Sequence, residues 1–215
     1  MHILIAHDEA FNFTYRANID ALRLLGDVSF FSPLHDHVLP ACDLLYLPGG
    51  YPELYLSEIA ANASLRRQIH DYAEQDGRIL AECGGFMLLA ANLEVGDQSW
   101  PMAGLFPVTV TWSSRPQGLG YVEGQVVAQN PFFPQGQQLR GHEFHYSRVQ
   151  GQVQGALLLS RGTGMGAGQD GLVLHNVWAS YTHIFAPAVP VWAINFVAAA
   201  KAFAASGPTP LKNTG

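Results

Sequence analysis

The stretch that most restricts the fold of this chain is residues 78–89, with Cys83 at its centre. A short apolar run leads into Cys83, two glycines follow it, and the next apolar stretch predicts a helix. Small neighbours let a strand turn sharply into a helix around an exposed nucleophile. The helix N-terminus would favour a thiolate, and the N–H of Gly84 would face the oxygen of an attacked carbonyl. We therefore predict that Cys83 is a nucleophile, and the alternative is a small buried thiol at a strand end.

Composition narrows the class of protein. The 215 residues predict one domain over residues 1–205, followed by a flexible C-terminal tail over residues 206–215. Two cysteines make no disulfide framework, and the chain shows neither a signal-peptide pattern nor an apolar run long enough for a membrane, so we expect a cytoplasmic protein. A net charge of -6 without a basic cluster argues against nucleic acid. Only 13% of residues are charged, which hints at a permanent partner or a homo-oligomer contact.

The order of elements predicts an α/β fold. Apolar runs at residues 2–6, 28–31, 43–47 and 79–80 read as strands, and residues 18–26 and 62–75 read as helices between them. We expect Asn18 and Gly26 to cap the first of these helices. Strand–helix–strand order favours a mostly parallel sheet flanked by helices. Residues 105–111, 119–128 and 139–149 predict an antiparallel extension in the middle of the chain, before a strand at 172–179 and a helix at 191–205.

A second glycine pair follows the third predicted strand. Gly49 and Gly50 allow backbone conformations that are closed to other residues, and they can aim N–H groups into a crevice at the carboxyl edge of the sheet. We predict a second oxyanion donor and part of the substrate wall here. A plain turn is the alternative.

A catalytic cysteine needs a base nearby in space. His183 comes just after the strand at 172–179, and the carboxyl ends of parallel strands share one edge, so we favour His183. His142 and His145 are the rivals. Spaced three apart on a strand, these two histidines point to opposite sides, and no further ligand cluster completes a zinc site, so we predict no metal. A structural or partner-contacting role is expected for residues 141–147.

Several long stretches together resemble a known family. They are AHDEAFNF at 6–13, FSPLHD at 31–36, PGGYPEL at 48–54, AECGG at 81–85, LGY at 119–121, GHEFHYS at 141–147 and ASYTH at 179–183. In this order they resemble the glutamine amidotransferase domain of cobyrinic acid a,c-diamide synthase and cobyric acid synthase, the cobalamin-type branch of the class I amidotransferases. The resemblance covers the whole domain and implies a class I, flavodoxin-like fold.

The resemblance also implies a reaction. Cys83 would attack the side-chain amide of glutamine, ammonia would leave, and water would hydrolyse the glutamyl thioester. His183 matches the family's base, and Gly49, Gly50 and Gly84 match its oxyanion and glutamine-binding positions. Most class I enzymes have a glutamate where this chain has Phe185, although the cobalamin-type branch also lacks it. Glu143 and Glu53 are candidates for the missing orienting acid.

The same two glutamates, with His142 and His145, are candidate contacts to a partner or an acceptor. In the family, ammonia passes to an ATP-dependent ligase that amidates carboxylates of a corrinoid. This chain has no phosphate-binding loop with its lysine, and residues 162–168 are glycine-rich without one. We therefore expect no cofactor on this chain, with ATP and Mg on a missing ligase domain or partner protein. The chain would be one subunit of a split enzyme or a domain of a longer one.

Three other readings stay open at this point. The chain could be a non-catalytic pseudo-amidotransferase that acts as a binding subunit, or a glutaminase that serves a non-corrinoid amidoligase, or a peptidase-like Cys–His hydrolase. The acceptor is equally open between cobyrinate, hydrogenobyrinate, a nickel-containing tetrapyrrole and a non-tetrapyrrole compound.

Overall fold

The computed structural model describes residues 1–206, so the predicted tail falls outside the described residues from 207 onward. A six-stranded sheet forms the centre, in the order β13-β14-β4-β3-β1-β2. Five strands are parallel and β13 alone runs antiparallel, against β14. The strands are β1 (His2–Ala6), β2 (Asp27–Phe31), β3 (Leu44–Leu47), β4 (Ile79–Glu82), β13 (Leu172–Leu174) and β14 (Val177–Ser180).

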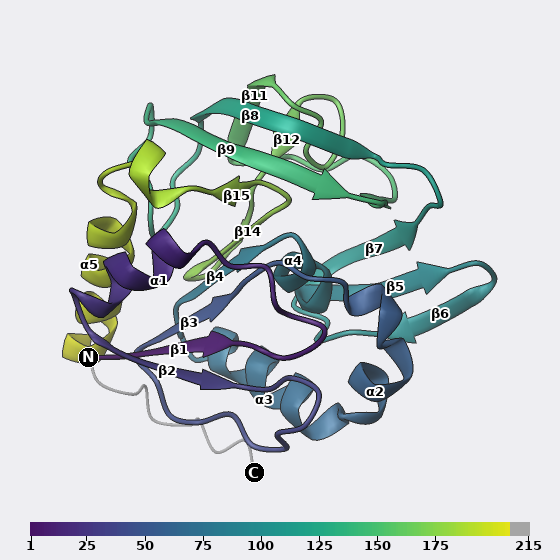
Figure 1. Cartoon of the computed structure of the whole chain (residues 1–215), viewed down its shortest axis with the longest axis horizontal. Coiled ribbons are helices and arrows are strands. Elements are labelled where there is room, and N and C mark those ends of the chain that lie inside the picture. Colours follow the sequence, from purple (N-terminus) through teal and green to yellow (C-terminus); the bar gives the residue numbers. More distant parts are fainter. Residues whose placement is uncertain (207–215) are drawn as a thin grey trace, which may run out of the picture.

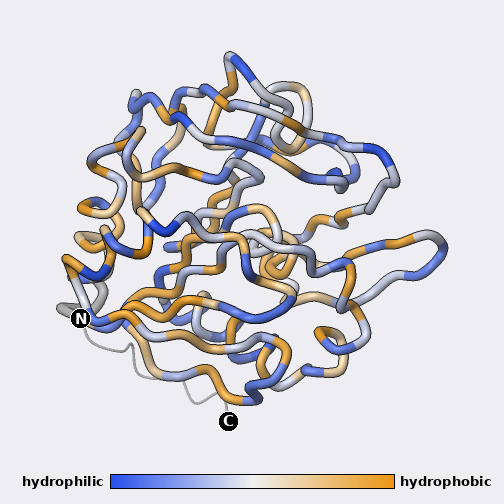
Figure 2. The backbone as a smooth tube through the Cα atoms, viewed as in Figure 1, coloured by the Kyte–Doolittle hydropathy of each residue, from blue (hydrophilic) through white to orange (hydrophobic). Residues whose placement is uncertain are grey.

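Helices cover both faces of this sheet (Figure 1). Side chains alternate between the faces of a strand. Leu4 therefore joins a core with α3, while Ile3 joins a second core with α1 and α5. The central strands carry the hydrophobic colours of Figure 2. The helices are α1 (Arg16–Arg23), α2 (Leu56–Ala61), α3 (Ala63–Glu74), α4 (Gly84–Leu89) and α5 (Trp192–Ser206), with short 3-10 turns η1 (Pro52–Leu54) and η2 (Ala186–Ala188).

The antiparallel extension is present and forms two smaller sheets. One has the order β12-β11-β8-β9-β15 and the other β10-β7-β5-β6. Their strands are β5 (Ala90–Val95), β6 (Gln98–Pro101), β7 (Phe106–Trp112), β8 (Gly118–Val126), β9 (Gln138–His145), β10 (Ser147–Val149), β11 (Leu157–Arg161), β12 (Gln169–Asp170) and β15 (His183–Ile184). Figure 1 shows the five-stranded sheet stacked above the central one. The predicted strand at 139–149 breaks at Tyr146, because its two halves pair in different sheets.

Two local predictions were wrong. The apolar stretch at 172–179 is a hairpin, since His175 takes a left-handed conformation (φ 50°) and turns β13 back onto β14. Asn18 does not cap α1, which begins at Arg16. The Asn18 amide is buried and bonds instead to the carbonyl of Ile184 and the N–H of Ala186, so long-range contacts replace the local cap. By contrast, the helix predicted at 62–75 is present as α3, and Asn62 caps it by accepting a hydrogen bond from the N–H of Leu65.

Within residues 1–206, no helix has the length and apolar character needed to cross a bilayer.

Candidate active site

Cys83 occupies a sharp turn between β4 and α4. Its φ of 47° and ψ of -103° are strained for a residue with a side chain. The turn is held by the Cys83 N–H, which donates to the carbonyl of Ser180 at the end of β14 (2.7 Å). Gly85 packs so closely on the carbonyl of Leu47 that a side chain at this position would overlap it. The elbow predicted from the sequence is therefore present, at the carboxyl edge of three parallel strands.

The Cys83 thiol is 4% exposed, and its surroundings favour the protonated form. Burial raises the pKa of Cys83 well above its ordinary value, and the negative charges of Glu53 and Glu82 raise it further. The N–H of Gly84 acts in the opposite direction, with a smaller effect. The N–H at the start of α4 thus acts in the direction predicted from the sequence, and burial outweighs it. The sulfur donates weakly to the carbonyl of Phe144 (3.8 Å).

His183 lines the same cavity of about 90 Å³ as Cys83. Its imidazole is 3% exposed and meets the ring of Phe13 edge to face, with 4.6 Å between ring centroids. Burial lowers the pKa of His183 to about 3, with a further contribution from the nearby His142 and His145. At neutral pH the imidazole is therefore uncharged, which is the form that a general base needs. Its Nδ1 has no hydrogen-bond partner among the described residues.

The three predicted glycines meet at this cavity. A methyl group on Gly49 would overlap the His183 imidazole, so only glycine lets the ring lie where it does. A Cβ on Gly84 would come within 2.9 Å of the Gly50 nitrogen, which places these two backbones side by side next to Cys83. This is the place, beside the sulfur, where the predicted oxyanion hole would need its two N–H donors.

The buried carboxylate of Glu82 links the elbow to the strand of His183. One of its oxygens accepts from the Tyr46 hydroxyl (2.7 Å), and the other accepts from the backbone N–H of Ile184 (3.1 Å). Burial raises the pKa of Glu82 to about 7, an effect that these hydrogen bonds partly oppose. Sequence analysis did not single out Glu82, although a charged residue at the end of an apolar strand is a signal that it needs buried partners.

A second buried carboxylate, Asp170, holds the segment on the other side of His183. It accepts from the N–H of Tyr181 (3.0 Å), the N–H of Thr182 (3.0 Å) and the Thr182 hydroxyl (2.6 Å). The backbone on both sides of the imidazole is thus fixed by acidic side chains. Asp170 was also missed, because it stands alone in a glycine-rich region.

Glu143 and His145 lie inside the domain. The Glu143 carboxylate accepts from the N–H groups of Thr163 (2.6 Å) and Gly164 (2.8 Å), and His145 Nε2 lies 3.3 Å from it. The His145 ring stacks on Tyr181 at 3.8 Å. Glu143 therefore fixes the glycine-rich loop at 162–168, and both side chains are buried within this chain.

His142 lies between the Cys83 cavity and a larger neighbouring one. The second cavity, about 550 Å³, is open and lined by aromatic, small and charged residues of both signs, Glu123 among them. They include Tyr15, Tyr121, Arg140, Arg161 and Phe185. His142 borders both cavities. Of the contact residues predicted in 141–147, it therefore has the most suitable position to contact a partner or an acceptor.

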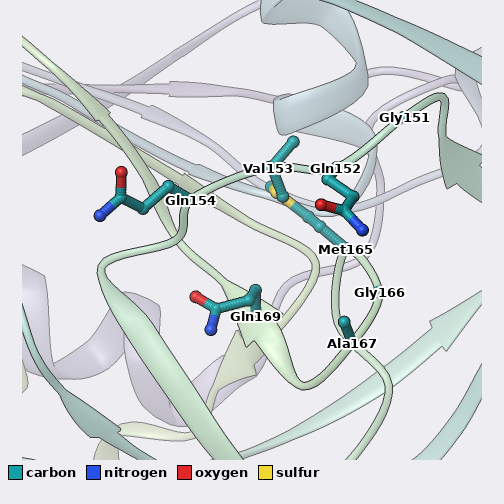
Figure 3. Close-up of a pocket in the computed structure, with 8 residues that line it drawn as sticks. All are labelled: Gly151, Gln152, Val153, Gln154, Met165, Gly166, Ala167 and Gln169. Atoms are coloured by element: carbon teal, nitrogen blue, oxygen red, sulfur yellow. The ribbon is translucent and has the colours of Figure 1, made fainter.

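Another pocket, of about 480 Å³, lies apart from Cys83 between the loops at 151–154 and 165–169 (Figure 3). Three glutamine amides and Met165 line it, and it holds no acid, base or nucleophile. Within residues 1–206, no group of three or more His, Cys, Asp and Glu side chains is placed to hold a metal ion.

Comparison with known proteins agrees with this geometry. The family model described as the CobB/CobQ-like glutamine amidotransferase domain matches residues 2–189. Cobyrinate a,c-diamide synthase of Methanothermobacter thermautotrophicus is 42% identical over 200 residues, which cover 91% of this chain and 44% of that protein. The synthase of Methanosarcina acetivorans is 38% identical, with 94% and 44% covered. The chain thus spans less than half the length of these curated relatives.

Solved structures confirm the predicted fold. PurLQS from Thermotoga maritima aligns with a TM-score of 0.66 at 20% identity, over 93% of this chain and 96% of that one. A glutamine amidotransferase from the same organism aligns with a TM-score of 0.57 at 16% identity, over 95% of this chain and 84% of that one. At this identity the likeness establishes the architecture alone.

Proposed function

The chain belongs to the CobB/CobQ-like glutamine amidotransferase domain family, and from that premise we propose that Cys83 and His183 hydrolyse the side-chain amide of glutamine. The observation that carries the proposal is the shared cavity. A strained elbow presents the Cys83 thiol to the same enclosed space as a buried, neutral imidazole. A nucleophile and a base in one small cavity are the minimum for acyl transfer.

The reaction balances with these groups. His183 removes the thiol proton as the sulfur attacks the amide carbon, and the N–H groups of Gly50 and Gly84 stabilise the oxyanion. The protonated His183 returns its proton to the leaving nitrogen, so ammonia departs and a glutamyl thioester remains on Cys83. Water, deprotonated by the same imidazole, then attacks the thioester carbonyl. Glutamate leaves and the thiol is restored.

The ammonia is used elsewhere. Because the relatives are more than twice as long as this chain, we propose that a ligase domain or partner supplies ATP, Mg and the acceptor site. We propose a corrinoid acceptor, cobyrinate or hydrogenobyrinate, amidated on its a and c carboxylates in cobalamin biosynthesis, and the names of these relatives support the first of the two. The neighbourhood of the two cavities contains several large apolar side chains that are exposed and suited to a partner surface. They are Phe13, Tyr51, Leu119, Tyr121 and Phe185.

Glutamate release tests the hydrolysis. The chain is assayed with glutamine as purified, together with the Cys83→Ser and Cys42→Ser variants. Cys42 is the matched control, because it is the other free cysteine, lies outside the cavity, and has a pKa raised to about 11 by burial. We expect Cys83→Ser to abolish release and Cys42→Ser to retain it. Equal glutamate release from the wild type and the Cys83→Ser variant would overturn Cys83 as the nucleophile, and no release from the wild type would favour a non-catalytic binding subunit.

The acceptor needs a separate experiment. The chain, copurified with its ligase partner, is given ATP, Mg, cobyrinate and glutamine labelled with ¹⁵N in the side chain. Incorporation of two labelled nitrogens into the corrinoid supports the proposed acceptor. Glutamate release coupled to ATP hydrolysis without corrinoid labelling would favour a non-corrinoid amidoligase.

A further inference from the structure

The space beside the Cys83 sulfur contains one carboxylate, that of Glu53. Glu53 lies on η1, three residues after Gly50, and lines a small extension of the thiol cavity with Cys83, Met87 and Phe144. Within the described residues, no lysine or arginine lines either cavity that Cys83 borders. Among the described residues that line these two cavities, the basic side chains are the imidazoles of His142, His145 and His183, so the carboxylate faces the thiol with no lysine or arginine beside it.

The chain itself gives Glu53 little to bind. Over residues 1–206, its carboxylate has a hydrogen bond with its own backbone N–H and forms no ion pair. Burial raises the pKa of Glu53, which reflects the cost of a half-buried carboxylate without a partner. A carboxylate of this kind in a cavity is suited to a cationic group of a ligand.

Glutamine brings such a group. Its α-ammonium nitrogen is separated by four bonds from the amide carbon that Cys83 would attack. We propose that the Glu53 carboxylate binds the α-ammonium group of glutamine while the amide lies at Cys83. The inference rests on the proposed function, because it assigns the recognition of that substrate. Ammonium–carboxylate hydrogen bonds are among the stronger polar contacts in proteins.

Binding at Glu53 also affects the thiol. After burial, the charge of Glu53 is the largest cause that raises the pKa of Cys83. A bound ammonium group offsets that charge, so Cys83 becomes easier to ionise when glutamine is present. An amide substrate without the ammonium group does not offset the charge of Glu53, so the pKa of Cys83 stays raised. Glu53 thus favours glutamine in two ways. It increases the affinity for the substrate, and in the bound state it makes the Cys83 thiol more reactive.

Covalent labelling tests this without a ligase partner. Cys83 is labelled with 6-diazo-5-oxo-L-norleucine and with the same diazoketone lacking its α-amino group, and the second-order rate is read by mass spectrometry. Glu53→Gln preserves the shape of the side chain, and Glu58→Gln is the control on neighbouring α2, where the glutamate is exposed. We expect Glu53→Gln to slow the amino reagent by on the order of tenfold or more. The des-amino reagent should react with Glu53→Gln at the wild-type rate or faster, since loss of the charge also favours the thiolate, and Glu58→Gln should match the wild type with both reagents.

A second measurement separates charge from structure. Without substrate, Glu53→Gln should speed the alkylation of Cys83 by iodoacetamide at a given pH, since the opposing charge is gone. If Glu53 had a purely structural role, Glu53→Gln would slow the reaction of Cys83 with both diazoketones and with iodoacetamide alike. An unchanged preference of this variant for the amino reagent would also overturn the proposal. If neither diazoketone labels wild-type Cys83, the proposed function itself fails, whereas a lost preference in Glu53→Gln alone supports the assignment.

Discussion

The carboxylate of Glu82 accepts a hydrogen bond from the backbone N–H of Ile184 at 3.1 Å, although the two residues are 102 positions apart. Glu82 directly precedes the candidate nucleophile, and Ile184 directly follows the candidate base. The contact therefore fixes the relative position of Cys83 and His183 through their backbones. A family member without a glutamate at position 185 can position its imidazole in this way, by fixing the strand on which it lies.

Removal of this carboxylate should affect both stability and activity. Glu82→Ala leaves the Tyr46 hydroxyl and the Ile184 N–H buried without a partner, which costs about 2 kcal/mol or more of unfolding free energy. We also expect kcat/KM for glutamine to fall by about tenfold or more, since a small displacement of a catalytic pair is enough. Urea unfolding and glutamate release measure the two effects.

The matched variant is Glu82→Gln. An amide can still accept from Ile184 and can donate to the Tyr46 hydroxyl, so both contacts survive. It should keep activity within about threefold of the wild type. If Glu82→Ala were as active as Glu82→Gln, the contact with Ile184 would have no positioning role.

The raised pKa of Glu82 predicts a particular dependence of stability on pH. Its ordinary value is 4.5, and burial raises the pKa to about 7 in the folded protein. Between these values the native state binds a proton that the unfolded chain has released, so this group lowers stability as pH rises from 4.5 to about 7. Relative to the wild type, Glu82→Gln should gain up to about 3 kcal/mol of unfolding free energy over that window. A pH-independent difference between the two proteins would contradict the assignment.

The lowered pKa of His183 predicts an unusual rate profile. The pKa of an exposed imidazole is about 6.5, so its neutral fraction falls about tenfold between about pH 7.5 and 5.5. Because burial lowers the pKa of His183 to about 3, its neutral form persists over that range. We expect kcat/KM for glutamine to fall by less than about threefold. The measurement is best made in Glu82→Gln, which removes a buried carboxylate with a pKa of about 7, and a midpoint near about 6.5 would be the contrary result.

Gly49 offers a steric test of the imidazole position. A methyl group here would overlap the His183 ring, so Gly49→Ala should displace the base and lower glutamate release by about a hundredfold. Gly96→Ala is the control, since nothing lies within 4 Å of its added methyl and its left-handed φ of 60° tests backbone strain alone. Circular dichroism should show both variants folded. Full activity in Gly49→Ala would place His183 elsewhere during the reaction.

The sequence was sufficient for the features that depend on local pattern and chain order. The apolar run of β1 and the helical pattern of α3 are local signals, and both elements appear where predicted. The meeting of Cys83 and His183 follows from topology, because β4 and β14 are parallel neighbours whose carboxyl ends share one edge.

Long-range contacts account for what the sequence did not reveal. Asn18 looks like a helix cap, yet its amide bonds to residues 184 and 186, far along the chain. Glu82 and Asp170 are ordinary acidic residues in sequence, and their roles arise from backbone N–H groups that only the folded chain brings to them. A hydrophobic pattern in the sequence does not predict a contact of this kind, because the contact depends on tertiary structure.

The central claim, that Cys83 attacks the amide carbon of glutamine, is tested most directly by the mass of the intact chain after treatment with 6-diazo-5-oxo-L-norleucine. We predict one adduct per chain, mapped to Cys83 by peptide sequencing, retained in Cys42→Ser and lost in Cys83→Ser and in the presence of excess glutamine. An adduct on Cys42, or an unmodified Cys83 under conditions that label other class I amidotransferases, would contradict the account.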